Sequence, residues 1–449
     1  MSKAHVIGLG KSGFAAAQLL KYKGWTVTVS DCGQNEALRQ QQQQLDERDI
    51  PVRLGEAFDP ETVKSLDLLV VSPGVPWDLP NLQRARELGI ETIGEMELAW
   101  RHLQHAPWLG ITGTNGKTTT TALTEAIFKA AGCHAPACGN IGNAACELAL
   151  AQAQENTPLN WVIAEVSSYQ IESSKTLSPR IGIWTTFTPD HLSRHKTIEN
   201  YYDIKAKLLA ASEFQVFNGD DPYLRNTATQ WPNAYWTSTT NDAALKPFAY
   251  IEGDSVVVDG EPVVAVSALQ MPGSHNRQNL LMSVAAARLA GLDADAIAEA
   301  IAKFPGVPHR LEVLGCWNGV QFINDSKATN YDAAEVGLAS VATPVILIAG
   351  GEPKAGEARA WLKTIREKAA FVLLIGEAAS LFAEKLEQVG YSNYEIAETM
   401  ERAVVRSREM APKYNTKTVL LSPACASFDQ YPNFEARGDR FRQLCREFL

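Results

Sequence analysis

The chain has 449 residues, 45% of them hydrophobic and 20% charged, which provides apolar material for roughly three domains of about 150 residues each. Its 41 Lys and Arg residues are outnumbered by 51 Asp and Glu residues, and the net charge of −10 argues against a nucleic-acid partner. Seven cysteines without C-x-x-C spacing, a strand pattern at the N-terminus and no apolar stretch of bilayer length predict a cytoplasmic protein with no membrane partner.

The first hundred residues alternate strand and helix patterns. Strands are expected at residues 4–8, 26–30 and 66–72, and a helix at 14–21. The loop after the first strand has the pattern G-x-G-x-x-G and contains Lys11 and Ser12, and Asp31 ends the second strand. This spacing is typical of a dinucleotide site, but the same tight turn and helix N-terminus suit any nucleotide diphosphate.

A second loop of this region, Ser72-Pro73-Gly74, follows the third strand. It lies at the carboxyl end of that strand, where open α/β sheets place their ligands. A plain Pro-Gly turn explains the same residues equally well.

The most informative stretch is a phosphate-loop pattern between an apolar run and a helical pattern. Its glycines let successive backbone N–H groups point at phosphate oxygens, and the helix N-terminus adds partial positive charge. Lys117 is expected to reach the outer phosphates and Thr118 to offer its hydroxyl to Mg²⁺. Ile111 stands where the common pattern has glycine, so the loop is a variant. The nucleotide-binding residues expected from the pattern are Gly113, Thr114, Asn115, Gly116, Lys117, Thr118 and Thr119.

Two buried strands are expected after the phosphate loop, at residues 161–166 and 181–187, and a polar residue follows each. Glu165 ends the first and could hold Mg²⁺, although a solvated strand-end charge would look the same. His191 follows the second and is interpreted as a metal ligand or phosphate contact, against the more common structural role of a lone histidine.

Further along, Asn276 and Asn279 lie one helical turn apart, where two amides can contact an adenine or bridge phosphates. Helix capping alone would explain Asn276. Beyond a Pro- and Gly-rich boundary, Arg310, Lys327 and Lys354 follow strands or sharp turns. They are the local cations that an acidic protein needs around a transferring phosphate and a carboxylate substrate.

These patterns predict three α/β domains with mostly parallel sheets covered on both faces. The expected limits are 1–95 for an N-terminal Rossmann-like domain, 96–306 for a central P-loop ATPase-like domain and 307–449 for a C-terminal Rossmann-like domain.

Six motifs occur in the chain in a fixed order: GTNGKT from Gly113, EVSS from Glu165, Asp190-His191, His275-Asn276, His309-Arg310, and DSKATN from Asp325. With them the chain resembles, over essentially its whole length, the Mur ligases, the ATP-dependent amino-acid ligases of peptidoglycan precursor synthesis. Residues 139–142 and 422–430 favour the family member that adds D-glutamate to UDP-N-acetylmuramoyl-L-alanine (UDP-MurNAc-L-Ala). Another Mur-type or folylpolyglutamate-type ligase is the alternative.

The resemblance implies roles for individual residues. Contacts to UDP-MurNAc-L-Ala are implied for Lys11, Ser12, Asp31, Ser72, Pro73, Gly74, Asn140 and His191. Contacts to ATP, beyond the phosphate loop, are implied for Asn276, Asn279, Arg310 and Asp325. Contacts to D-glutamate are implied for Lys327, Thr329, Lys354, Ser427 and Phe434.

The resemblance also implies two Mg²⁺ ions and a lysine carbamylated by CO₂. The metal ligands are then Thr118, Glu165, His191 and the carbamate of Lys205, and the catalytic residues are Lys117, Glu165, His191 and Lys205. Lys205 fits the family spacing of Tyr, three residues, then Lys, and Lys207 is the alternative. A monomer is expected. A nicotinamide oxidoreductase and a nucleotide-dependent binding switch are the rival classes, and the first leaves the phosphate loop unexplained.

Overall fold

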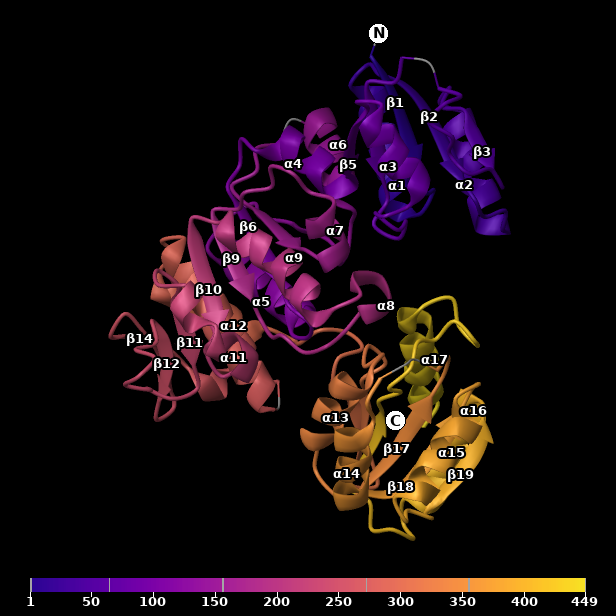
Figure 1. Ribbon diagram of the computed structural model, residues 1–449. Coiled ribbons are helices and arrows are strands. Elements are labelled where there is room, and N and C mark those ends of the chain that lie inside the picture. The colour runs from indigo at the N-terminus through magenta and orange to yellow at the C-terminus, as the bar shows by residue number, and fades with distance from the viewer. Residues whose placement is uncertain (1, 64, 156, 272, 354–355, 449) are drawn as a thin grey trace. The chain divides into compact units, whose positions relative to one another are not determined.

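The structure is a computed structural model that describes residues 2–63, 65–155, 157–271, 273–353 and 356–448 (Figure 1). Three separate sheets organise these residues. The chain divides into two compact units, one of residues 1–269 with 278–304 and the other of residues 270–277 with 305–449. The three-domain α/β fold predicted from the sequence is confirmed, and the expected domain limits stay predictions.

The N-terminal domain is a parallel sheet of five strands in the order β3-β2-β1-β4-β5. Its strands are β1 (Lys3–Ile7), β2 (Thr26–Asp31), β3 (Val52–Leu54), β4 (Leu68–Val71) and β5 (Glu91–Gly94), and its helices are α1 (Lys11–Tyr22), α2 (Glu36–Asp46) and α3 (Pro80–Glu87). The strand order changes direction at β1, so the loops after β1 and β4 meet at the carboxyl edge, which is the ligand position of such sheets.

The central domain carries a sheet of nine strands in the order β14-β13-β12-β11-β10-β9-β6-β8-β7. The strands are β6 (Trp108–Thr112), β7 (Ala137–Gly139), β8 (Val162–Glu165), β9 (Ile181–Trp184), β10 (Phe214–Asn218), β11 (Tyr235–Ser238), β12 (Ala249–Glu252), β13 (Ser255–Val258) and β14 (Glu261–Ala265). The helices are α4 (Glu95–Leu103), α5 (Lys117–Ala130), α6 (Ala145–Glu155), α7 (Ser168–Glu172), α8 (Leu192–His195), α9 (Ile198–Ala210), α10 (Pro222–Asn226), α11 (Ser274–Leu289) and α12 (Ala294–Lys303), with 3₁₀ turns η1 (Ala228–Gln230) and η2 (Val266–Ala268).

The two outermost strands of this sheet, β13 and β14, pair antiparallel, and the sequence analysis did not predict them. Two-residue turns join β12 to β13 and β13 to β14, and the second is Asp259-Gly260 with φ angles of 51° and 80°. An Asp-Gly pair with positive φ at both positions is the usual hairpin turn, so the signal was present in the sequence.

The N-terminal and central domains share one hydrophobic core, which explains why they form a single unit. Helix α1 packs against α6, and Leu19, Leu20, Cys146 and Ala149 are each at most 1% exposed. The alanine-rich face of α1 allows a close approach of the two helices.

The C-terminal unit contains a sheet of six strands in the order β15-β16-β20-β17-β18-β19, parallel except for β15. The strands are β15 (Glu312–Trp317), β16 (Val320–Asn324), β17 (Val345–Gly350), β18 (Ala369–Ile375), β19 (Tyr394–Glu398) and β20 (Thr418–Leu421), and the helices are α13 (Tyr331–Ala339), α14 (Arg359–Lys368), α15 (Ala379–Gln388), α16 (Met400–Met410) and α17 (Phe434–Arg446) (Figure 1). Alternate residues of β17 face two different cores: Leu347 packs with α13, α14 and α15, whereas Ile348 packs with α16 and α17. The unbroken apolar run of β17 therefore reflects a strand that is buried on both faces.

None of the helices among the described residues has both the length and the apolar character needed to cross a bilayer.

Candidate active site

The phosphate loop follows β6, the strand that lies between β8 and β9. Gly113 and Gly116 have φ angles of 150° and 83°, and a Cβ added at Gly113 would lie 1.9 Å from Thr185 Oγ1. The loop backbone is tied to the end of β9, because the Thr114 N–H donates to the Thr186 carbonyl at 2.8 Å. Two glycine positions and a fixed backbone give the loop the geometry of a phosphate cradle.

Lys117 and Asn279 complete the loop from its two sides. Lys117 Nζ donates to the carbonyls of Gly113 and Thr114 at 2.7 and 2.8 Å, so its charge lies over the loop. Asn279 on α11 accepts from Thr120 Oγ1 at 3.2 Å, and its Oδ1 lies 2.7 Å from a Cβ added at Gly116. Asn279 therefore contacts the phosphate loop, whereas Asn276 is buried one turn earlier and belongs to the other unit.

Glu165 ends β8 and is 1% exposed. Its Oε1 accepts from Asn140 Nδ2 at 2.7 Å, and the Asn140 N–H donates to the Glu165 carbonyl at 2.9 Å. Among the described residues, its buried Oε2 has no hydrogen-bond partner. An unsatisfied carboxylate oxygen in a buried place is costly, and a bound cation would satisfy it.

Lys205 on α9 is 1% exposed and contacts the same loop. Its Nζ donates to the Gly113 carbonyl at 3.0 Å and to Thr112 Oγ1 at 3.3 Å, and it lies 4.8 Å from the centre of the Tyr201 ring. Burial lowers the pKa of Lys205 well below its ordinary value of 10.5, and the charge of Lys117 lowers it further. Lys207, the alternative from the sequence, is exposed.

His191 lies in a left-handed backbone position, φ 55°, just before α8. Its Nδ1 is 3.0 Å from the Tyr169 hydroxyl, and its Nε2 is 3.6 Å from Asp190 Oδ2. No group of three or more His, Cys, Asp or Glu side chains gathers for a metal ion in the part of the chain that the structure describes. A divalent cation here would need further ligands from phosphates or water, which is the usual coordination of Mg²⁺.

The N-terminal domain contributes the two loops that meet at its sheet edge. The buried Ser72 hydroxyl donates to the Gly8 carbonyl at 2.7 Å, so the Ser72 loop is attached to the glycine loop and is more than a plain turn. The Asp31 carboxylate accepts from the N–H groups of Leu9 and Gly33, both at 2.7 Å, and thereby shapes the glycine loop. Lys11 donates from its Nζ to the Gly142 carbonyl of the central domain. Ser12 is half-buried, as is Pro73, and Gly74 is exposed.

In the C-terminal unit, Asp325 lies at the end of β16 and is 4% exposed. Its carboxylate accepts from Ser422 Oγ at 2.8 Å. Burial raises the pKa of Asp325 from 3.8 to about 7, against the opposing charge of Arg310. Partial burial lowers the pKa of the half-buried His275 to about 4, and the charge of Arg310 adds to this effect.

The predicted D-glutamate residues form a second group in this unit. Lys327 Nζ lies 5.0 Å from the centre of the Phe434 ring, Ser427 is 2% exposed, and Thr329 is half-buried. Lys354 lies outside the described residues.

Arg437 on α17 joins the segments that carry these residues, and the sequence analysis missed it. It is 1% exposed and donates to the carbonyls of Ser326, Cys425 and Ala426 at 2.9 to 3.1 Å. Its neighbourhood in the sequence, FEARGDRFR, looks like the solvated face of a charged helix, so the sequence held no signal for its burial.

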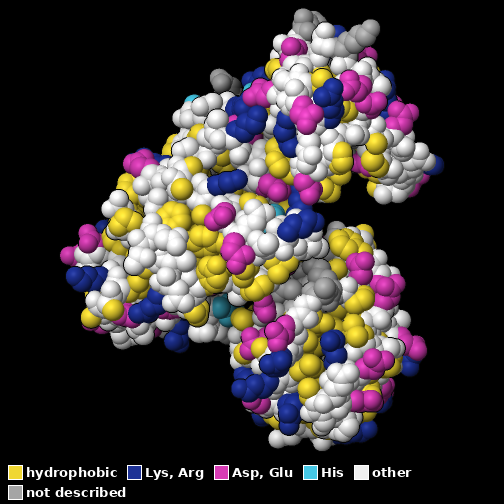
Figure 2. All heavy atoms as spheres, in the orientation of Figure 1, with side chains coloured by type: hydrophobic (Ala, Val, Ile, Leu, Met, Phe, Trp, Pro, Cys, Tyr) yellow, Lys and Arg dark blue, Asp and Glu magenta, His cyan; other side chains and the backbone are white. Residues whose placement is uncertain are grey.

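Acidic and basic side chains are interspersed over the face seen in Figure 2 and do not gather by sign. The positive groups available to a polyanionic ligand are therefore local ones, such as Lys117, which is bound to the phosphate loop.

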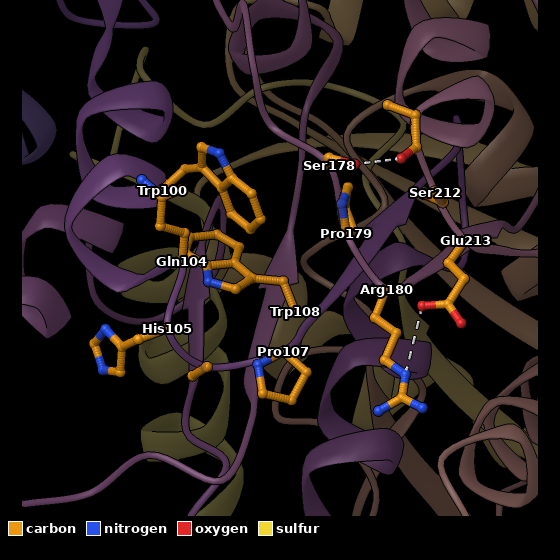
Figure 3. A pocket seen from close by; sticks show the side chains of 12 residues that line it. Trp100, Gln104, His105, Pro107, Trp108, Ser178, Pro179, Arg180, Ser212 and Glu213 are labelled. Carbon is orange, nitrogen blue, oxygen red and sulfur yellow. Dashed lines mark hydrogen bonds and ion pairs between the residues drawn. The ribbon is translucent and has the colours of Figure 1, made fainter.

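A hollow of about 480 Å³ lies at the other edge of the central sheet, before β6 and β9 begin (Figure 3). Trp100, Pro107 and Pro179 line it, with the Arg180–Glu213 ion pair at 3.7 Å. It opens at the amino ends of strands whose carboxyl ends carry the phosphate loop, so it is separate from the candidate site.

Models of three domains match the chain in order: the Mur ligase MurD-like N-terminal domain at residues 2–94, the Mur ligase middle domain at 111–287 and the Mur ligase glutamate ligase domain at 309–425. A protein of Trichormus variabilis named UDP-N-acetylmuramoylalanine–D-glutamate ligase is 64% identical over 100% of both chains. A protein of the same name from Nostoc punctiforme is 62% identical over 99% of this chain and 96% of its own.

Among solved structures, the UDP-N-acetylmuramate-alanine ligase MurC of Thermotoga maritima has a TM-score of 0.61 at 18% identity, and a pseudomurein peptide ligase type C of Methanothermus fervidus has 0.59 at 20%. Each alignment covers 100% of both chains, and at this identity it shows the shared fold. Because three domain models match in order and relatives above 60% identity span its whole length, the chain belongs to the Mur ligase family.

Proposed function

We propose that this chain is an ATP-dependent ligase that joins D-glutamate to UDP-MurNAc-L-Ala through an acyl-phosphate intermediate. One observation carries the proposal: two buried ionisable residues lie beside the phosphate loop, Glu165 with an unsatisfied oxygen and Lys205 without an ion-pair partner among the described residues. The relatives named UDP-N-acetylmuramoylalanine–D-glutamate ligase support the choice of substrates.

The reaction needs activation because a carboxylate is a poor electrophile. The alanyl carboxylate attacks the γ-phosphate of ATP, which gives an acyl phosphate and ADP. The amine of D-glutamate then attacks the acyl carbon, phosphate leaves, and the amine proton is lost to water. Two anions must approach each other in the first step, so Lys117, held 2.7 Å from the Gly113 carbonyl, would neutralise the charge that develops.

The three substrates are assigned to three groups of residues. The UDP end would lie on the Gly8–Gly13 and Ser72–Gly74 loops with Lys11, Ser12 and Asp31. The muramoyl end would reach Asn140 and His191. ATP would lie on residues 113–119 with Asn276, Asn279, Arg310 and Asp325, and D-glutamate near Lys327, Thr329, Lys354, Ser427 and Phe434.

Mg²⁺ fits the residues beside the phosphate loop. Glu165 Oε2, Thr118 and His191 would hold it, and Mg²⁺ would supply positive charge to the phosphates during transfer. We propose two such ions, with a carbamate on Lys205 as an additional anionic ligand. The carbamate forms when Lys205 Nζ attacks CO₂ and loses one proton. Burial of Lys205 beside Gly113 and exposure of Lys207 support Lys205 as the modified residue.

We place the enzyme in the cytoplasm, since all seven cysteines are free thiols, as expected in a reducing compartment. One chain supplies all three groups of residues, so the proposal requires no second copy, and we expect a monomer.

The deciding experiment measures phosphate release with ATP, Mg²⁺ and UDP-MurNAc-L-Ala against a panel of amino acids that includes both glutamate enantiomers. Release that depends on D-glutamate, with a product of the matching mass, is the expected result. Release with another amino acid would replace the assigned ligase activity with that of another family member. No release with any amino acid would contradict the proposal, and NADH binding or folate turnover would then favour a rival class.

A further inference from the structure

Arg194 lies on the short helix α8, three residues after His191, and joins two domains. Its side chain is only 12% exposed. Nη1 donates to the Val75 carbonyl of the N-terminal domain at 3.2 Å, while Nε and Nη2 donate to Glu172 Oε2 of the central domain at 3.2 and 2.8 Å. One guanidinium group thus holds an atom of each domain at a fixed spacing.

On the central-domain side, the network continues to the candidate metal ligand. The Arg194 guanidinium carbon lies 4.9 Å from the centre of the Tyr169 ring, and the Tyr169 hydroxyl is 3.0 Å from His191 Nδ1. The Arg194 N–H also donates to the His191 carbonyl at 2.9 Å. Both the ring and the backbone of His191 are therefore held by groups that Arg194 contacts.

On the N-terminal side, Val75 belongs to the loop that meets the glycine loop. Its N–H donates to the Ser72 carbonyl at 3.0 Å, and its Cγ2 lies 2.9 Å from a Cβ added at Gly8. A second arginine of the N-terminal domain, Arg86, donates to the Trp77 carbonyl at 3.0 Å. Burial lowers the pKa of Arg86, and the charge of Glu172 opposes this effect. The bond from Arg194 to Val75 thus reaches the loop pair that is proposed to hold the nucleotide diphosphate.

We propose that Arg194 is a positioning residue that sets the distance between the nucleotide-diphosphate loops and the His191 loop. This distance would favour a ligand that carries the nucleotide and the muramoyl group in one molecule over the nucleotide alone. This proposal rests on the proposed function, because it takes a nucleotide-linked sugar acid as the ligand that spans both loops. A ligand with only the nucleotide end contacts the nucleotide-diphosphate loops alone, so its affinity does not depend on the distance to the His191 loop. A linked ligand binds both places at once and loses affinity when the spacing changes.

The test compares the binding of UDP-MurNAc-L-Ala and of UDP by calorimetry in the wild type, Arg194→Gln and Arg194→Lys. Arg194→Gln removes charge-assisted hydrogen bonds, so we expect the affinity for UDP-MurNAc-L-Ala to fall about tenfold or more. The affinity for UDP should stay within about twofold of the wild-type value. In turnover, the KM for UDP-MurNAc-L-Ala should rise, kcat should fall to a smaller extent because His191 loses part of its support, and the KM for ATP should change little.

Arg84→Gln is the matched control, because Arg84 is also an arginine paired with a glutamate, but it lies within the N-terminal domain and pairs with Glu61 and Glu87 in exposed positions. It should leave both affinities unchanged. If Arg194→Gln fails to fold, Glu172→Gln provides the second variant, since it removes the anchor and leaves the arginine in place. Equal losses for UDP and UDP-MurNAc-L-Ala, or no loss for either, would overturn the proposal.

Failure of the proposed function is a separate result. It would appear as absent D-glutamate-dependent phosphate release in the wild type, whereas the binding comparison between the two ligands needs no turnover.

Discussion

Lys205 and Glu165 show how single side chains adapt the phosphate loop to a charged ligand. Both are about 1% exposed, and neither forms an ion pair with another described residue. Burial of an unpaired charged group is unfavourable unless the group is neutralised or meets an opposite charge. In the proposed reaction both groups gain a partner of opposite charge, because Mg²⁺ would bind Glu165, the carbamate of Lys205 and the phosphates.

Replacement of Lys205 by Ala should therefore remove most of the ligase activity, since an anionic metal ligand is lost. Short carboxylic acids such as formate should restore part of it by occupying the vacated space. Lys207→Ala is the control and should behave as the wild type. Phosphate-release assays of both variants check this, and an inactive Lys207 variant beside an active Lys205 variant would reverse the assignment.

Glu95 and Glu97, two residues apart on α4, differ in how their carboxylates are satisfied. Glu95 Oε1 accepts from the Cys146 N–H at 2.6 Å, but its Oε2 has no hydrogen-bond partner among the described residues. Glu97 accepts from Lys175, Thr176 and Arg101. Burial raises the pKa of Glu95 from 4.5 to about 7, whereas for Glu97 these hydrogen bonds outweigh burial and lower the pKa below 4.5.

The two glutamates should consequently give opposite pH dependence. Between pH 4.5 and about 7, folded Glu95 keeps a proton that the unfolded chain loses, so the free energy of unfolding falls as pH rises through this window. Glu95→Gln removes that loss, so the free energy of unfolding of the variant relative to the wild type should rise by about 3 kcal/mol from pH 4 to pH 8. Glu97→Gln should instead be less stable than the wild type at pH 8. Urea unfolding at both pH values measures this, and parallel curves for wild type and Glu95→Gln would contradict it.

The sequence identified those site residues whose position follows from the backbone, at a glycine turn or at the end of a strand. Gly113 and Gly116 stand where only glycine fits, and Glu165 ends a strand whose apolar run is visible in the sequence. Arg194 and Arg437 could not be found in this way, because their partners are carbonyl groups far away in the chain.

At the level of elements, the sequence analysis predicted parallel strands of the sheets but not the antiparallel edge strands β13, β14 and β15. β17, β18 and β20 are buried on both faces and read as continuous apolar runs. β15 has no buried residue and β14 is exposed at three of its five positions, whereas β13 carries the apolar run Val256–Val258 that the sequence analysis did not use. Their better signal was the turn chemistry of Asp259-Gly260 and Asn318-Gly319, where all four residues have positive φ.

A comparison of Gly116 with Gly260 can distinguish the cost of backbone strain from an effect on ligand binding. Gly116 in the phosphate loop and Gly260 in the hairpin have φ angles of 83° and 80°. A Cβ at Gly260 meets nothing within 4 Å, whereas one at Gly116 meets Asn279 Oδ1 at 2.7 Å. Alanine at either position should reduce stability by about 1 kcal/mol, from the left-handed backbone alone.

Only Gly116→Ala should also weaken ATP binding, because Asn279 must move and the loop N–H groups move with it. Thermal unfolding and ATP titration of both variants test this comparison. Wild-type ATP affinity in Gly116→Ala would show that the loop tolerates a side chain.

For the whole molecule, the proposed function assigns substrate contacts to residues of both units, so we predict a hinge in the segment that joins them. Gly306, with a φ of 87°, follows the point where the chain passes from Phe304 to Pro305, and Gly306–Pro308 is the predicted hinge.

Cross-linking that restricts motion of the two units should therefore abolish turnover while each unit keeps its fold. Small-angle scattering should show a smaller radius of gyration once UDP-MurNAc-L-Ala, D-glutamate and a non-hydrolysable ATP analogue are all present. Full activity in a chain locked open would contradict the hinge.

The division of the chain into two units affects where a stable C-terminal fragment can begin. Residues 270–277 belong to the C-terminal unit although they precede residues 278–304 of the other one. Within that unit His275 Nδ1 lies 3.4 Å from Ser340 Oγ and next to the charge of Arg310. A fragment that starts at residue 305 would lack residues 270–277 and expose the surface they cover, so we expect a stable C-terminal fragment to need both segments.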